Sequence, residues 1–193
     1  MRAPASGAGG VRFSYWIQLK RGLEVESFAS SVLLVLNRLG LHRVHLHSAP
    51  PGQTEVAGSL AAVLATVTTL VSVAALVLVY VLYWHRRREP MILAWAAAVL
   101  AFVAFAKSFS PQYVDWLVPL VPAAGAVASI LLLIIVRLTH SELQRFLHTP
   151  GGPSSNHYTD VLTWWVVVRD LLVVALYALL VVFLRRSPTS RSP

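Results

Sequence analysis

The chain has 193 residues, of which 56% are hydrophobic and 12% charged, and its mean hydropathy is +0.66. Soluble domains carry about 25% charged residues, so this composition indicates a membrane protein. The net charge of +8 does not indicate nucleic-acid binding, because the positive charges lie at the ends of apolar segments, as in the positive-inside pattern. The absence of cysteine excludes disulfides and thiolate metal sites.

The N-terminal residues 1–22 do not resemble a signal peptide, because no apolar core precedes a cleavage site. Residues 1–14 are expected to form a flexible lead, and Phe13–Leu19 is amphipathic. The next apolar segment, Ser27–Leu39, would reach only about 20 Å as a helix, less than the roughly 30 Å hydrocarbon core. It is therefore predicted to be a short re-entrant or interfacial helix, with Ser27 as its N-cap and Gly40 as its stop.

Residues 41–58 are predicted to form a polar loop interrupted by the Pro-Pro-Gly sequence. The loop contains His42, His45 and His47. Without a carboxylate or a fourth ligand this spacing does not predict a metal site, and neither a metal nor another cofactor is expected.

Three long apolar segments follow: Ser59–Trp84, Met91–Ala106 and Asp160–Leu184. Arginines after the first and the last of them, at 86–88 and 185–186, indicate that both ends face the cytoplasm, which requires an even number of crossings between them. The region between is either one helix, Gln112–Arg137, or two arms, 111–121 and 123–139, separated by proline and glycine. The two-arm interpretation satisfies the even count. It places Lys107–Tyr113 outside and makes residues 139–160 the last outer loop.

Charged residues within apolar segments are candidates for function because they are costly in a bilayer. Lys107 either snorkels from a helix end or contributes to a site. Arg169 either forms a structural ion pair or binds a lipid phosphate through its bidentate guanidinium. Of the possible carboxylate partners, Asp115 is predicted rather than Asp170, because residues one apart do not face each other on a helix.

A second polar cluster is RGLEVES, residues 21–27. Glu24 and Glu26, beside Arg21, could bind sugar hydroxyls or take part in proton transfer. The alternative is a solvated and capped helix start.

Three sequence boxes carry a resemblance to a known family. RGLEVES is similar to the RGLQIES box, and KSFSPQYVDWLVPL (107–120) to the K-x-x-SPQY-x-x-W-L-x-P box, of bacterial GT-C class glycosyltransferases that use polyprenol-phosphate sugars and include mannosyltransferase-like proteins. VVVRDLLVVAL (166–176) resembles their terminal RN-x-LL helix. The boxes occur in the family's order.

The resemblance implies an outward-facing cavity for a polyprenyl-phosphate-linked sugar. It assigns donor binding to Lys107, Gln112 and Tyr113, and places Arg21, Glu24 and Glu26 in the same cavity; Arg169 completes the candidate phosphate site. Asp115 stands where the family usually has an apolar residue. The family's catalytic carboxylate lies in an earlier outer loop, so its counterpart is unknown here. The chain is expected to correspond to the C-terminal half of such an enzyme and to be inactive alone. Three alternatives remain open: a truncated gene product, a half that assembles with a separate N-terminal half, or a relic without activity.

The predicted fold is therefore all-α: a polytopic bundle with four to five membrane segments over residues 15–186, a short tail at 187–193, and a multi-pass location in the plasma membrane. Two functions are expected from different classes. One is a hexosyl- or mannosyltransferase acting on the outer face. The other is a non-catalytic lipid-binding or assembly subunit.

Overall fold

The computed structural model describes residues 21–49, 53–85, 91–147 and 162–186. These residues are mostly helical, with six α-helices, one 3-10 helix and three short strands. The predicted all-α class is confirmed in that helices dominate the structure, and a small sheet that was not predicted lies at one end. The expected lead and tail fall outside the described residues.

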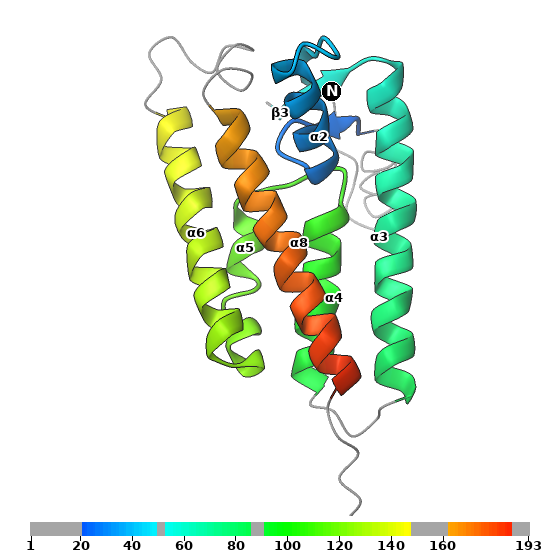
Figure 1. Ribbon diagram of the computed structural model, residues 1–193, viewed down its shortest axis with the longest axis vertical. Coiled ribbons are helices and arrows are strands. Elements are labelled where there is room, and N and C mark those ends of the chain that lie inside the picture. Colours follow the sequence, from blue (N-terminus) through cyan, green and yellow to red (C-terminus); the bar gives the residue numbers. More distant parts are fainter. Residues whose placement is uncertain (1–20, 50–52, 86–90, 148–161, 187–193) are drawn as a thin grey trace, which may run out of the picture.

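Four helices run along the length of the molecule: α3 (Ser59–His85), α4 (Met91–Phe105), α6 (Ala126–Leu147) and α8 (Thr163–Arg186) (Figure 1). Helix α4 packs against both α3 and α8, and α6 packs against the other side of α8. Fully buried alanines on α4, among them Ala96, Ala97 and Ala101, let the neighbouring backbones approach closely. The hydroxyl of Tyr177 on α8 donates to the carbonyl of Ala75 on α3 at 3.1 Å.

Two of the described helices are long and apolar enough to cross a membrane, α3 with 27 residues and α8 with 24. At 1.5 Å per residue each exceeds the roughly 30 Å hydrocarbon core. Helix α3 leaves valine and leucine side chains exposed along its length, for example Val63, Leu70 and Val77. An apolar surface of this kind suits contact with lipid.

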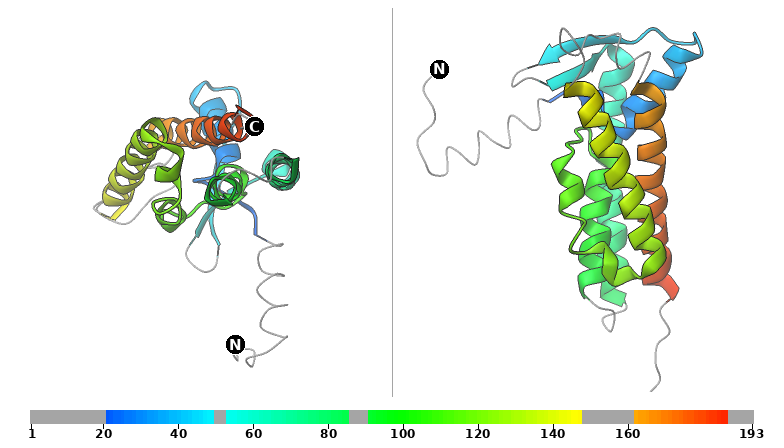
Figure 2. Two further views of the ribbon diagram at one scale, coloured as in Figure 1. Left: turned by 90° about the horizontal axis from the view of Figure 1, so that it is seen from below. Right: turned by 90° about the vertical axis from the view of Figure 1, so that its left-hand side faces the viewer.

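The short helix α2 (Phe28–Arg38) confirms the helix predicted for this segment. Ser27 is its N-cap, and the Ser27 hydroxyl accepts a hydrogen bond from the backbone N–H of Ser30. The helix ends before Gly40, as predicted. Helix α2 and the sheet cover the end of the bundle where α8 begins (Figures 1 and 2).

The predicted polar loop is instead a hairpin of β2 (His45–Ala49) and β3 (Gln53–Ala57). The central strand β3 also pairs antiparallel with β1 (Leu23–Glu24), so that Leu23 lies opposite Val56. Val56 is buried against Leu23, whereas His45 and His47 point to the exposed face. The loop prediction failed because burial of one strand face outweighs the polar composition.

The region 111–125 breaks the helical path, so the single-helix alternative is wrong. Helix α5 spans only Gln112–Asp115, turns follow, and a 3-10 helix, η1, covers Val121–Ala124. Gly125 has a φ of 99°, a value that only glycine adopts readily, and α6 starts at the next residue. Helix α6 then continues through Leu147, so the first part of the expected outer loop is helical. Its remainder, residues 148–160, lies outside the described residues.

Candidate functional site

The three sequence boxes meet at the end of the bundle that carries the sheet. RGLEVES supplies β1 and the cap of α2, KSFSPQY follows the end of α4, and the arginine box lies in the N-terminal half of α8. The backbone N–H of Glu24 donates to the carbonyl of Lys107 at 2.9 Å. This bond joins the first box directly to the second.

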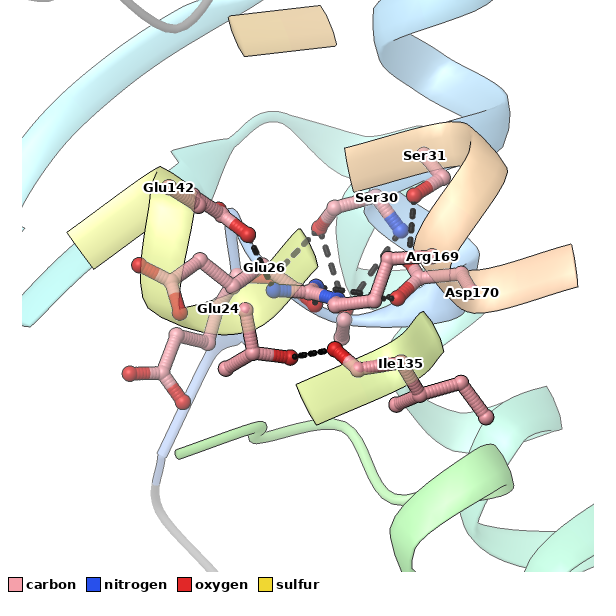
Figure 3. A network of polar contacts seen from close by, with 10 residues as sticks. Glu24, Glu26, Ser30, Ser31, Ile135, Glu142, Arg169 and Asp170 are labelled. Carbon is pink, nitrogen blue, oxygen red and sulfur yellow. Dashed lines mark hydrogen bonds and ion pairs between the residues drawn. The ribbon is translucent and has the colours of Figure 1, made fainter. Parts of the chain in front are cut away.

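Arg169 is the centre of a buried polar network (Figure 3). Its Nη1 donates to Oε2 of Glu142 at 2.5 Å, and its Nη2 donates to the carbonyl of Glu26 at 2.6 Å. Its Nε and Nη2 donate to Oδ1 of Asp170 at 3.0 and 2.9 Å. The guanidinium carbon lies 4.0 Å from the centre of the Phe109 ring, a cation–π contact. Arg169 therefore forms hydrogen bonds with the first box, with its own box and with α6, and a cation–π contact with the second box.

The predicted pairing of Arg169 with Asp115 is wrong. Asp115 is exposed on α5, and Arg169, whose side chain has no exposed surface, pairs with Glu142 and Asp170. Neighbouring residues on a helix point apart at Cβ, but the three-carbon stem of arginine is long enough to fold back toward an adjacent carboxylate. The same contacts occupy most of the guanidinium donors, so in this arrangement Arg169 offers no open face to a phosphate.

Asp170 is held from a second side. The hydroxyl of Ser31 on α2 donates to its Oδ2 at 2.5 Å. Ser30, next in the same helix, donates to the carbonyl of Glu24 at 2.6 Å. These bonds fix the start of α2 against the start of α8, and they satisfy polar groups that would be costly to bury alone.

A second network lies nearer the surface and contains Arg21, Glu24 and Ser108. The Ser108 hydroxyl donates to Oε2 of Glu24 at 2.6 Å and accepts from Nη1 of Arg21 at 3.3 Å. Burial raises the pKa of the Glu24 carboxyl above its ordinary value, while the bond from Ser108 acts in the opposite direction. The cluster places a carboxylate, a hydroxyl and a guanidinium within reach of one another.

Glu55 of β3 supports this network from the sheet. Its Oε1 accepts from the backbone N–H of Gly22 at 3.1 Å, and its Oε2 lies 3.5 Å from Nε2 of His47. A Cβ atom added to Gly22 would collide with this carboxylate, so the glycine permits the close approach. Burial lowers the pKa of the Lys107 ammonium, and the negative charge of Glu55 partly offsets that effect.

A cleft of about 410 Å³ lies beside the second box, between α5 and α6. Its polar lining comes from Ser110, Gln112, Asp115, Thr139 and His140. Pro111, Val114 and Val136 complete its walls. Of the predicted site residues only Gln112 lines it. Tyr113 turns to an aromatic cluster instead, with its ring 5.7 Å from that of Phe102 and 4.9 Å from that of Trp116.

The structure thus divides the predicted site residues into separate groups. Arg21 and Glu24 share the outer network, Lys107 is joined to it through its backbone, and Glu26 and Arg169 belong to the buried network. Gln112 and Tyr113 lie further along the second box. No group of three histidine or acidic residues suited to a metal occurs in the described part of the chain.

Sequence reasoning missed Glu142, Ser108 and Ser31, which bind Arg169, Glu24 and Asp170 respectively. Glu142 was assigned to a loop, although it follows Thr139 by three residues and so continues one face of α6. A buried arginine such as Arg169 requires a carboxylate partner. The position of Glu142 on the same helical face as Thr139 was the sequence signal that could have identified this partner.

Neither a family model, nor a curated protein, nor a solved structure matches the chain.

Proposed function

We propose that this is an integral membrane protein that binds a polyprenyl-phosphate-linked sugar at the end of the bundle where the three boxes meet, and that it serves glycosyl transfer of the GT-C kind. The observation that carries the proposal is the bonding between boxes far apart in sequence. Arg21 contacts Ser108, 87 positions away, and Arg169 contacts the carbonyl of Glu26, 143 positions away. Boxes that converge in this way are expected to form one site.

The headgroup phosphate is assigned to Arg21 and Lys107. Both side chains are only partly buried at this end of the bundle, and charge-assisted hydrogen bonds from cations suit a phosphate. Arg169 supports the site from below by fixing Glu26, Phe109 and the start of α8. Glu24, held by Ser108, is then positioned for hydroxyls of the sugar.

The orientation follows from the basic residues at the opposite end. The end of α3 at His85 and the end of α8 at Arg186 lie together, away from the sheet (Figure 1). If both face the cytoplasm, as the positive-inside pattern indicates, the site faces outward in the plasma membrane. Besides α4 and α8, the broken segment 111–125 and α6 then supply the other two of the four crossings in the multi-pass proposal. Irregular backbone in the first of these is tolerated where surrounding protein covers it.

A second candidate is a non-catalytic lipid-binding or assembly subunit. It is favoured by the engagement of the acidic side chains of Glu142 and Asp170 in contacts with Arg169. Carboxylates committed to a buried ion pair are poorly placed to activate an acceptor. Both candidates require the lipid site, and they differ only in turnover.

The test is binding of a polyprenyl phosphate to the purified protein in nanodiscs. Lys107→Ala and Arg21→Ala should each weaken binding about tenfold, the effect of losing one charge-assisted hydrogen bond. Arg137→Ala, which removes an exposed cation on α6, is the matched control and should bind as wild type. Binding that is unchanged in both site variants contradicts the proposal. Transfer from a polyprenyl-phosphate mannose donor then distinguishes the enzyme from the subunit.

A further inference from the structure

The cleft between α5 and α6 has a composition unlike its surroundings. Five of its lining residues are polar, although the neighbouring helices are largely apolar. Its volume of about 410 Å³ falls within the range of small-molecule sites, about 300–1,000 Å³. Polar side chains at such a position are costly unless they face water or a ligand.

The charge of the cleft limits which ligand it can accept. Asp115 contributes a carboxylate, and no lysine or arginine of the described segments lines the cleft. A phosphate or carboxylate ligand would therefore meet repulsion. The carboxylate makes no side-chain hydrogen bond or ion pair with another described residue, so its oxygens are available to accept hydrogen bonds from a ligand.

The remaining polar groups favour a ligand that both donates and accepts hydrogen bonds. Gln112 offers an amide and His140 an imidazole, both exposed. The Thr139 hydroxyl gives its proton to the carbonyl of Ile135 at 2.8 Å, which leaves its oxygen as an acceptor. Such a mixture of a carboxylate, an amide and hydroxyl oxygens matches neighbouring hydroxyl groups of a sugar.

A second observation comes from the same face of α6. Glu142 lies three residues beyond Thr139, so the two side chains are neighbours on the helix. Its Oε2 binds Arg169, but its Oε1 is buried and has no hydrogen-bond partner among the described residues. Among the described residues this acceptor therefore stays open to a donor, such as a hydroxyl of a ligand beside the cleft.

We infer that the cleft of Ser110, Gln112, Asp115, Thr139 and His140 is a binding site for a neutral, hydroxyl-rich headgroup, separate from the phosphate site at Arg21 and Lys107. As a carbohydrate site it stands independently. As the place of the acceptor sugar it rests on the proposed function. Asp115 is its principal anchor, because a charged acceptor makes the strongest hydrogen bonds with hydroxyl donors.

The probe is radiolabelled octyl glucoside, added below its micellar concentration to the protein in nanodiscs. Saturable binding is expected, and Asp115→Ala should weaken it about tenfold or more. His140→Ala should weaken it less, since a neutral group is lost. Ser141→Ala, on the same helix but outside the cleft, is the matched control. Because Asp115 is exposed, its variant should retain the unfolding midpoint of wild type.

Competition experiments separate the alternatives. Octylammonium that displaces the glucoside more strongly than unlabelled glucoside does would overturn the inference in favour of a cationic ligand. Binding that is absent, or equal in Asp115→Ala and wild type, also overturns it. Arg21→Ala and Lys107→Ala should leave glucoside binding unchanged. If polyprenyl phosphate fails to bind while glucoside binds through Asp115, the proposed function fails and the carbohydrate site stands.

Discussion

Replacement of Arg169 by glutamine tests whether the buried network is a structural centre. The substitution removes four hydrogen bonds, at 2.5, 2.6, 2.9 and 3.0 Å, and the cation–π contact with Phe109. It leaves Glu142 and Asp170 buried without their cation, since both are at most 5% exposed in their side chains. Breaking a buried ion pair by removal of one partner costs about 3–5 kcal/mol of unfolding free energy. We expect this total for Arg169→Gln rather than the sum over the four hydrogen bonds, because contributions within one network are not additive.

The assay is reversible unfolding of the detergent-solubilised protein, followed by circular dichroism. A loss of about 3–5 kcal/mol corresponds to a fall in Tm of roughly 6–20 °C for a chain of this size. Arg137→Gln removes an exposed arginine on α6 and is the matched control, expected within about 0.5 kcal/mol of wild type.

Two further variants make the test specific. Glu142→Gln should be destabilising, and its combination with Arg169→Gln should cost less than the sum of the two, because they remove the same ion pair. Asp115→Asn should be nearly neutral, since Asp115 is exposed and does not pair with Arg169. The reasoning is refuted if Arg169→Gln matches Arg137→Gln, or if Asp115→Asn is as costly as Arg169→Gln.

Three other predictions concern topology, close packing and pH. In intact cells a membrane-impermeant thiol reagent should label Ser110→Cys and spare His85→Cys; the reverse pattern contradicts the outward orientation. Gly22→Ala should destabilise the protein by about 1–3 kcal/mol in denaturant unfolding, because the new Cβ displaces the Glu55 carboxylate and its hydrogen bond; a neutral effect would refute the close approach. Burial holds the pKa of Glu24 above 4.5, so the folded state binds more protons and its stability should fall as pH rises from 4.5 through the raised pKa. Glu24→Gln should reduce this dependence of the unfolding free energy on pH, as measured by denaturant unfolding across the range. An unchanged dependence in the variant would show that another group causes the decline.

The long helices were predictable because their signal is local. Ser59–His85 and Thr163–Arg186 are long apolar runs, and their backbone groups are satisfied within each helix. The Ser27 cap was predictable for the same reason, since its side-chain bond reaches only to Ser30. The break before Ala126 followed from Pro122, whose ring fixes its own backbone, and from Gly125, which can adopt a positive φ; both effects are local to the chain.

The hairpin was not predictable from composition, although a weak alternation of apolar and polar residues runs through 44–47. Its central strand depends on β1, more than twenty residues earlier, and only that pairing gives Val56 a buried face against Leu23. The partner of Arg169 was equally undetermined. Asp115, Asp170 and Glu142 were all available carboxylates, and the choice depends on which helices pack together and how the arginine stem bends.

The sequence by itself determined the membrane-type composition, the long helices, the short capped helix and the three boxes that were expected to share a site. Each of these depends on neighbouring residues or on residue type alone. Only the tertiary structure decided that Arg169 forms its ion pairs with Glu142 and Asp170. It also decided that Ser108 connects Arg21 to Glu24, and that Asp115 lines a separate cleft. These arrangements arise where α2, α6, α8 and the sheet meet, because a buried polar group takes the partner that packing brings within bonding distance.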